Sequence, residues 1–402
     1  MSELTPGMHI VELDRPWIES PFLFQGFLLE TAEDIQMVQD VCRWVYVDVV
    51  EEEWQEYHGH QTITPQRRTM YVEKQDMAQQ LTRANRTYQS TKHQIKYLLN
   101  TAYLGQAMSL EGAKEAVKDC VERVIHNPTA ILWLTRLKHQ DEYTAEHSVN
   151  VCLLAIALGR EMDLAPYELE NLGICGLMHD IGKMKVPPEI LNKPDTLNPQ
   201  EFAEMARHTV YARQLLMGRS DIYPGAVDVA YSHHERLDGK GYPRGIDSSK
   251  ISLFTRIVTV ADAYDAMTSR RCYSEGMSST EALKIIHRHI GSQFDEEVAR
   301  KFIAMIGLYP PGYLLEMTNG EVGIILSSDP GYSLKPKVIM VLGADKQPQP
   351  ERIINLANAP QDDAGEFYKA AGVYRSGSFG VNINDYLEKG LRIKGFDYQM
   401  ND

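Results

Sequence analysis

Imidazole and carboxylate side chains recur through the middle of the chain at positions that helical periodicity would turn inward. They are His147, His179, Asp180, His208, His233, His234 and Asp262. His147, for example, shares one helical stripe with Val151 and Leu154. Asp180 and Asp262 follow or interrupt apolar runs, where a buried carboxylate needs a partner or a metal ion. Together these side chains offer the donor atoms that borderline transition-metal ions accept.

Each of these residues has an ordinary structural explanation when it is taken alone. A lone histidine on an apolar face is usually a hydrogen-bonded core residue, and a pair of adjacent histidines is more often on the surface than bound to a metal. The spacing favours a joint explanation, because successive sites lie about 25 to 32 residues apart, which suits one bundle helix and its return. Two ions bridged by Asp180 would acidify a shared water and hold a phosphodiester for in-line attack.

The segment HHERLDGKGYP, from His233 to Pro243, combines two candidate ligands with a glycine-containing loop. Adjacent residues on a helix point about 100° apart, so both histidines can reach one ion only near a helix end. The following LDGKGYP supplies such an end. Gly239 and Gly241 allow unusual backbone angles and close approach to a ligand, Tyr242 adds an aromatic ring, and Pro243 stiffens the exit.

The composition is that of an ordinary soluble protein of more than one domain. The chain has 402 residues, of which 43% are hydrophobic and 24% are charged, and its net charge is −14. This acidic balance argues against binding to a nucleic acid polymer. Five cysteines without a CxxC pair suit reduced thiols. The start MSELTPGMHIVELD has no signal-peptide pattern, and the longest apolar run is too short for a membrane span. We therefore expect a cytoplasmic protein.

The pattern along the chain predicts a multidomain fold. Residues 1–60 contain the strand-like segments MHIVELD, FLLET and WVYVDVV and the helical AEDIQMVQDVC, which predict a small α+β accessory domain. Residues 61–126 become helical and form a connector. Residues 127–308 read as an all-α helical bundle, in which Ser278 and Glu281 have capping-box spacing. Residues 309–402 are expected to form a small β-rich extension, with an Asn-Gly hairpin in YLLEMTNGEVGIIL and a strand in KPKVIMVL.

Residues 127–307 resemble the HD-GYP domain, a branch of the HD phosphohydrolases. The resemblance lies in the His179-Asp180 dyad, the unbroken signature HHERLDGKGYP and the segment DAYDAMTSRRCY. The bundle is therefore expected to be of the HD type. Residues 1 to about 125 resemble the accessory domain that often precedes it, through LDRPWIESPFLFQGF. Members of the family cleave cyclic dinucleotides, above all cyclic di-GMP.

The resemblance implies a role for each site residue. One ion would be held by His147, His179, Asp180 and Asp262, and the other by Asp180, His208, His233 and His234. Lys183 would stabilise charge on the scissile phosphate, although a solvated helix end also explains it. Glu235 would orient a ligand histidine. The substrate would contact Lys183, Arg271 and the loop LDGKGYP at residues 237–243, which is called the GYP loop below.

The sequence departs from the family pattern in two places. Some members carry a glutamate one turn before the first histidine, where it binds a third metal, but this chain has Tyr143 there. We therefore expect two divalent ions, iron or manganese, with nickel, zinc and cobalt as alternatives. After Arg271, Cys272 replaces the family's proline and Glu275 replaces a base. These changes bear on phosphate binding and substrate preference.

The sequence thus predicts a phosphodiesterase that opens cyclic di-GMP to linear pGpG and onward to GMP. Two alternatives stay open. The chain could be a weakly active or inactive receptor that binds the dinucleotide or a GGDEF-type synthase, or its preferred substrate could be the hybrid cyclic GMP-AMP. Residues 98–125 are helical enough to pair two chains into a homodimer, although packing on their own domain is the simpler explanation.

Overall fold

The computed structural model describes residues 77–126, 143–269, 276–329, 332–362 and 364–388. It also describes shorter stretches of the N-terminal region, at 8–13, 27–29, 32–42 and 45–48, and the single residues Leu4, Thr129, Trp133 and Thr135. The chain divides into two compact units, Met1–Val72 and Glu73–Asp402. Each unit is described by itself below.

The described residues of the N-terminal unit form a small antiparallel sheet and one helix. The strands are β1 (His9–Leu13), β2 (Phe27–Leu28) and β3 (Val45–Asp48), in the order β2-β1-β3, and the helix is α1 (Ala32–Val41). Ile10, Leu29, Val38 and Cys42 are buried together as a local core. These elements fall within the segments MHIVELD, FLLET, AEDIQMVQDVC and WVYVDVV.

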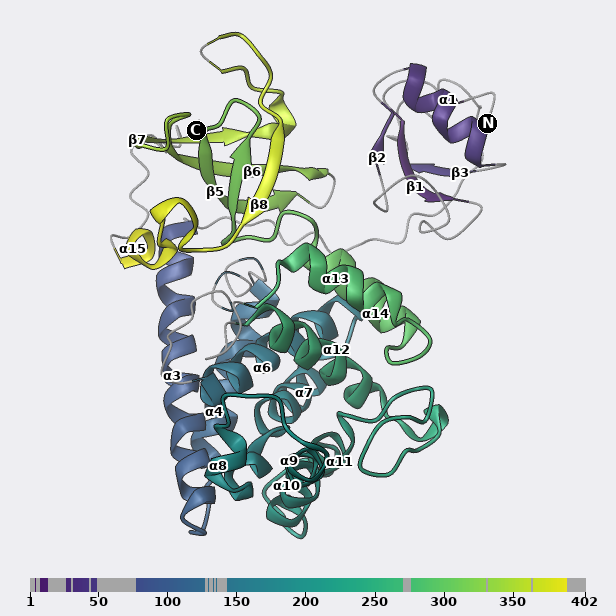
Figure 1. Cartoon of the computed structure of the whole chain (residues 1–402), viewed down its shortest axis with the longest axis vertical. Coiled ribbons are helices and arrows are strands. Elements are labelled where there is room, and N and C mark those ends of the chain that lie inside the picture. Colours follow the sequence, from purple (N-terminus) through teal and green to yellow (C-terminus); the bar gives the residue numbers. More distant parts are fainter. Residues whose placement is uncertain are drawn as a thin grey trace, which may run out of the picture. The chain divides into compact units, whose positions relative to one another are not determined.

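Two largely buried helices, α6 (Tyr143–Glu161) and α7 (Pro166–Met178, exposed in its first turn), lie inside the larger unit (Figure 1). Every residue from Ala145 to Gly159 is buried, which explains why α6 is apolar on all sides from Val151 to Leu158. The two helices pack closely, because a Cβ at Gly176 would lie only 2.9 Å from the Cα of Cys152. The end of α7 is thereby brought beside the first turns of α6.

Other helices of this unit pack around that pair. They are α3 (Met77–Tyr103), α4 (Glu111–His126), α8 (Pro188–Leu191), α9 (Pro199–Ala206), α10 (His208–Leu216), α11 (Pro224–Ser232), α12 (Leu253–Thr268), α13 (Ser279–Arg288) and α14 (Glu296–Ile306), with the short 3₁₀ turns η2 (Ile181–Lys185) and η3 (Ser248–Lys250). The capping box expected at Ser278 and Glu281 is confirmed at the start of α13. Val117 and Val121 of α4 belong to the same core as α6, so α4 packs on its own chain.

The C-terminal part of the larger unit contains one five-stranded antiparallel sheet. Its strands are β4 (Leu314–Met317), β5 (Val322–Asp329), β6 (Tyr332–Leu342), β7 (Pro348–Asn355) and β8 (Ala370–Tyr374), in the order β7-β6-β5-β4-β8. The predicted hairpin is confirmed, since β4 pairs with β5 across the turn at Gly320, whose φ is +88°. A last helix, α15 (Ile383–Glu388), follows.

The sheet and the helices share apolar packing. Leu314, Ile324 and Ile339 belong to the core that also contains α6, while the other face of the sheet has its own cluster around Leu315 and Met340. None of the helices in the described part of the chain has both the length and the apolar composition that crossing a membrane requires.

Candidate metal centre

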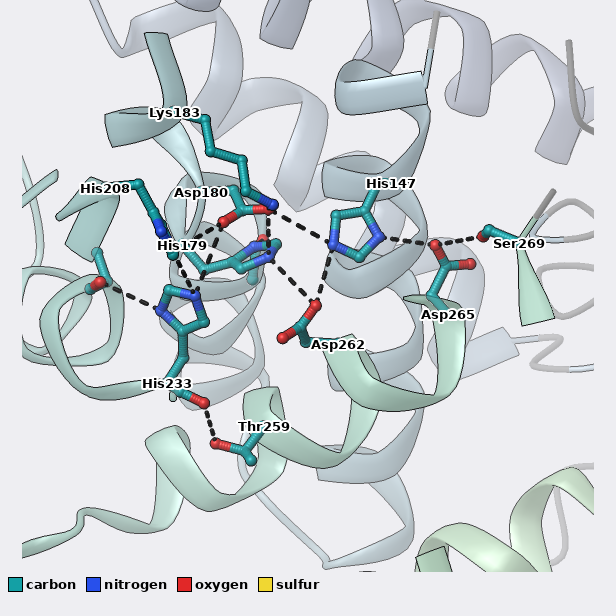
Figure 2. Close-up of polar contacts among 12 residues, drawn as sticks. His147, His179, Asp180, Lys183, His208, His233, Thr259, Asp262, Asp265 and Ser269 are labelled. Atoms are coloured by element: carbon teal, nitrogen blue, oxygen red, sulfur yellow. Dashed lines mark hydrogen bonds and ion pairs between the residues drawn. The ribbon is translucent and has the colours of Figure 1, made fainter. Parts of the chain in front are cut away.

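The seven expected ligands converge from five helices and their ends, and Figure 2 labels all of them except His234. His147 lies on α6 and Asp262 on α12, both within the helix. The remaining ligands stand at helix ends: His179 and Asp180 directly follow α7, His208 is the first residue of α10, and His233 and His234 directly follow α11. A side chain at a helix end can point along the helix axis. Side chains from several helix ends can therefore converge on one site.

The first group of donors contains His147, His179 and Asp262. One donor atom from each lies within 4.8 Å of the others. His147 Nε2 is 3.0 Å from Asp262 Oδ1, and His179 Nε2 is 3.8 Å from the same oxygen. His147 and His179 are almost completely buried. Three donors from three helices therefore face a common point.

The second group contains Asp180, His208, His233 and His234, whose donor atoms also lie within 4.8 Å of one another. The two adjacent histidines both reach it because α11 ends at Ser232, just before them. The ring centroid of His234 is 5.1 Å from that of His208 and 4.1 Å from that of His233.

The Asp180 carboxylate faces both groups. Its Oδ2 lies 3.6 Å from His147 Nε2 and 3.3 Å from His179 Nε2. Its Oδ1 lies 3.4 Å from His208 Nε2 and 3.7 Å from His233 Nε2. A carboxylate with one oxygen toward each group is suited to bridge two ions.

Hydrogen bonds fix which ring nitrogen of each histidine faces the centre. The Nδ1 atoms of His179, His208 and His233 lie 2.7, 2.8 and 3.1 Å from the backbone oxygens of Gly176, Met205 and Ala230, respectively. A carbonyl oxygen only accepts, so each Nδ1 carries the proton and donates. Burial lowers the pKa of His208 and of His233, so these two rings are neutral and present an Nε2 lone pair to the centre, as metal-binding histidines do.

These donor atoms fit a cation and little else. His208 Nε2 and His233 Nε2 lie 3.3 Å apart, and both also face Asp180 Oδ1. Three hydrogen-bond acceptors therefore lie close together. Among the side chains that the structure describes, buried His179 Nε2 and Asp180 Oδ1 have no hydrogen-bond partner. Buried polar atoms are normally paired, and a bound ion would satisfy these two. The mixed nitrogen and oxygen donors suit a divalent transition metal.

Burial and neighbouring charges set the protonation states. Burial lowers the pKa of His208 to about 4 and that of His234 to about 3, so both rings are neutral at pH 7 and ready to bind an ion. Burial would also lower the pKa of His147, but hydrogen bonds to Asp262 and Asp265 outweigh it and raise this pKa to about 9. An ion that binds at His147 near pH 7 must therefore displace a proton.

Lys183 lies one turn beyond Asp180, on η2, and its Nζ directly contacts Asp180 Oδ2. Burial would raise the pKa of Asp180, but the Lys183 ammonium and the nearby histidines hold it well below its usual range. The Lys183 side chain is 22% exposed, so the ammonium stands at the edge of the centre, where a substrate phosphate could meet it.

The structure gives Glu235 different partners from the expected histidine. Its carboxylate accepts hydrogen bonds from the backbone N–H groups of Arg244, at 2.7 Å, and Ile246, at 3.2 Å. Glu235 therefore closes the GYP loop against the end of α11. The expectation that it orients a ligand histidine is not supported by these contacts.

The GYP loop packs tightly against the second group. Gly239 has a φ of +70°, which favours glycine, and a Cβ at Gly241 would lie 2.5 Å from His234 O. Gly241 is thus needed for packing of the loop on its own backbone. Tyr242 stacks on the His234 ring with centroids 4.7 Å apart, and Pro243 follows. Arg271, the remaining expected substrate contact, lies outside the described residues.

Asp265 is a further carboxylate beside the centre, and the sequence pattern did not reveal it. Its Oδ2 accepts from His147 Nδ1 at 2.8 Å and from Ser269 Oγ at 2.9 Å, and its Oδ1 accepts from Asn150 Nδ2 at 3.0 Å. This carboxylate fixes the His147 ring and directs its Nε2 to the first group. The available signal was its position in DAYDAMTS, one helical turn after Asp262.

Asp265→Asn is expected to weaken binding of the ion at His147 by about 10- to 100-fold, the usual cost of losing a carboxylate behind a ligand histidine. The measurement is the metal content of the full chain after dialysis against a graded chelator. Thr268→Val, which removes a buried hydroxyl bonded only to the Tyr264 backbone oxygen, is the matched control on α12. Equal metal retention by the two variants would contradict this role of Asp265.

Comparison with known proteins agrees with this centre. Residues 133–298 match the HD domain family, and residues 1–113 match a domain of unknown function, DUF3391. Cyclic di-GMP phosphodiesterase PA4108 of Pseudomonas aeruginosa is 34% identical over 90% of this chain and 89% of its own length. This chain belongs to the HD-GYP family. The match to DUF3391 confirms that an accessory domain precedes the HD-GYP domain.

Two other known proteins are similar to a part of this chain. A 3′3′-cGAMP-specific phosphodiesterase 1 of Vibrio cholerae is 36% identical over 42% of this chain and 39% of its own length. The solved structure of Bd1817, an HDG"Y"P protein from Bdellovibrio bacteriovorus, is 18% identical, covers 74% of this chain and 94% of that chain, and has a TM-score of 0.47.

Proposed function

We propose that this HD-GYP protein is a metal-dependent phosphodiesterase that opens cyclic di-GMP to linear pGpG and then cleaves pGpG to GMP. The observation that carries the proposal is the pair of donor groups that share Asp180. The relative from Pseudomonas aeruginosa, which is named for cyclic di-GMP hydrolysis and matches nearly the whole chain, supports the choice of substrate.

In this proposal each donor group holds one divalent ion. His147, His179 and Asp262 would hold the first, His208, His233 and His234 would hold the second, and Asp180 would contribute to both. When bound, the two ions supply Lewis acidity and an activated water. We propose iron or manganese, with nickel, zinc and cobalt as alternatives, since nitrogen-rich mixed donor sets suit all of these metals.

The chain's own residues position the substrate and stabilise charge. A water attacks the phosphorus atom in line, the bond from phosphorus to the 3′ oxygen breaks, and that oxygen takes up a proton. Lys183 stabilises the negative charge that develops on the phosphate, and Tyr242, backed by the His234 ring, provides a flat surface for a guanine. We propose that Gly239, Gly241 and Pro243 shape this surface and that Arg271 contacts the substrate.

We also propose a domain organisation for the chain. Residues 1–60 form the α+β accessory domain, 61–126 the helical connector, 127–308 the catalytic domain and 309–402 the β-rich extension. The protein acts in the cytoplasm, and a GGDEF-type synthase is its partner. The connector helices of two chains pair to form a homodimer.

The test is turnover by the full chain purified under reducing conditions and loaded in turn with Mn²⁺, Fe²⁺, Zn²⁺, Ni²⁺ and Co²⁺. We expect cyclic di-GMP to be converted to pGpG with at least one metal and expect a chelator to stop the reaction. Chromatography of the products over time is the measurement. If no metal supports turnover while the dinucleotide still binds, the chain is a receptor and the proposed activity is wrong.

The Vibrio cholerae relative named for cGAMP favours a second candidate substrate. The same reaction on 3′3′-cyclic GMP-AMP replaces one guanine by adenine and leaves the phosphates unchanged. Parallel initial rates on the two cyclic dinucleotides, with equal metal loading, distinguish the candidates. A higher kcat/KM for the hybrid would reassign the substrate without changing the metal centre.

A further inference from the structure

A buried tyrosine of α3 is linked by hydrogen bonds to the metal centre. Tyr88 is 1% exposed, and its hydroxyl lies 3.1 Å from Oδ1 of Asn150, which is also 1% exposed. Asn150 stands three residues after His147 on α6, so the two side chains share a face of that helix. Asn150 Nδ2 in turn donates to Asp265, the carboxylate that holds His147 Nδ1.

The chemistry of each group determines which atom donates and which accepts in these hydrogen bonds. Asp265 is a carboxylate and only accepts, so Asn150 must present its amide N–H₂ to Asp265 and its oxygen to Tyr88. Burial and the nearby carboxylates Glu146 and Asp265 raise the pKa of Tyr88 well above its usual value, so its hydroxyl keeps the proton that it donates. Each bond therefore orients the next.

A second contact ties the same two helices together. Lys92 lies one turn after Tyr88 on α3, and its Nζ is 2.6 Å from Glu146 Oε1, beside His147 on α6. The side chains of this ion pair are 7% and 5% exposed. A buried charge pair tolerates little displacement, because separating two charges inside a protein costs free energy. The pair fixes the position of Tyr88 relative to α6.

Helix α3 lies outside the HD domain match at residues 133–298 and inside the match to the domain of unknown function at residues 1–113. We infer that the last helix of this domain of unknown function is a positioning element of the metal centre, acting through Tyr88, Asn150 and Asp265 on the His147 ring. The inference rests on the proposed metal centre. It assigns part of the DUF3391 segment an indirect role in metal affinity.

The experiment compares Tyr88→Phe with Thr91→Val in the full chain, using Co²⁺ as the probe. Thr91 is a buried residue of the same helix whose hydroxyl contacts the Thr87 backbone oxygen and Cys120 Sγ. Both variants lose one buried hydroxyl, but only Tyr88→Phe breaks the link to Asn150. Titration of the metal-free chains, followed by Co²⁺ absorbance, gives the affinity for each ion, and thermal unfolding of the same metal-free chains gives their stability.

Loss of a group that contacts a ligand histidine costs about 10- to 100-fold in metal affinity. Tyr88 is separated from such a group, Asp265, by two hydrogen bonds. We therefore expect Tyr88→Phe to weaken one Co²⁺ affinity about 3- to 10-fold, and Asn150→Ala to weaken the same affinity more. Thr91→Val should leave both affinities unchanged even where its melting temperature falls as much as that of Tyr88→Phe.

Two results would overturn the inference. If wild-type and Tyr88→Phe chains bind Co²⁺ equally well, α3 has no role in positioning His147, whatever the hydrolytic activity. The same holds if Thr91→Val weakens binding as much as Tyr88→Phe does, because the effect then follows stability. A wild-type chain that binds no Co²⁺, Mn²⁺ or Fe²⁺ would contradict the proposed metal centre as well, which separates failure of the proposed function from failure of this inference.

Discussion

Asp180→Asn is expected to reduce hydrolysis of cyclic di-GMP by about 10³-fold or more, with loss of at least one bound ion. The substitution keeps the size of the side chain and removes its negative charge. One Asp180 oxygen faces each donor group, and asparagine keeps only one oxygen, so the bridge is lost and at least one ion loses a ligand. The measurements are the metal content of the full chain and kcat/KM for the dinucleotide.

Asp221→Asn provides a control, because Asp221 is an exposed carboxylate paired with Arg219 and lies on none of the ligand helices. It should leave metal content and kcat/KM unchanged. An Asp180→Asn chain with wild-type activity would show that the carboxylate does not bridge ions. A variant that loses hydrolysis but keeps every cellular effect would favour a receptor that acts by binding.

The convergence of the candidate ligands could be predicted in part from the sequence, because a polar residue on an apolar helical face is a local signal. His147 and His208 lie on apolar faces, and a polar residue there must find a partner inside the fold. The β4–β5 hairpin was likewise predictable, because an Asn-Gly turn between two apolar runs is a short-range signal. In each case the residues that decide the structure are close together in the sequence.

The groups behind the ligands could not be predicted in the same way. Tyr88 and Asn150 are 62 residues apart, and nothing in α3 marks one tyrosine among several as buried against α6. Glu235 follows two ligand histidines, which favoured a role beside them, but the chain turns after α11 and directs this carboxylate to the returning loop. Long-range packing, which local pattern does not encode, decides both cases.

The order of the C-terminal strands shows the same limit. Strand β8 pairs with β4 and not with its sequence neighbour β7, so the last strand returns across the sheet to its opposite edge. A β-rich extension follows from strand-like segments, whereas this order depends on which edge of the sheet remains available. The sequence therefore predicts the elements of the extension better than their arrangement.

Lys183→Met is expected to lower kcat for cyclic di-GMP by about 10²- to 10³-fold while metal content stays at the wild-type level. The Lys183 ammonium contacts Asp180 Oδ2 and stands at the partly exposed edge of the centre. Once ions neutralise Asp180, this ammonium is free to meet the phosphate, whose negative charge grows in the transition state. Removing a positive charge beside Asp180 does not oppose cation binding, so the loss should fall on catalysis and not on metal affinity.

Lys185→Met is the matched control, since Lys185 is an exposed lysine on the same 3₁₀ turn and makes no contact with Asp180. It should retain wild-type kcat, KM and metal content. Steady-state kinetics on metal-loaded full chains, with metal content measured on the same samples, separate the two variants. If Lys183→Met behaves like Lys185→Met, Lys183 is an ordinary helix-end lysine. If it instead loses metal together with activity, its role is to support Asp180, and the charge on the phosphate must be stabilised by other groups.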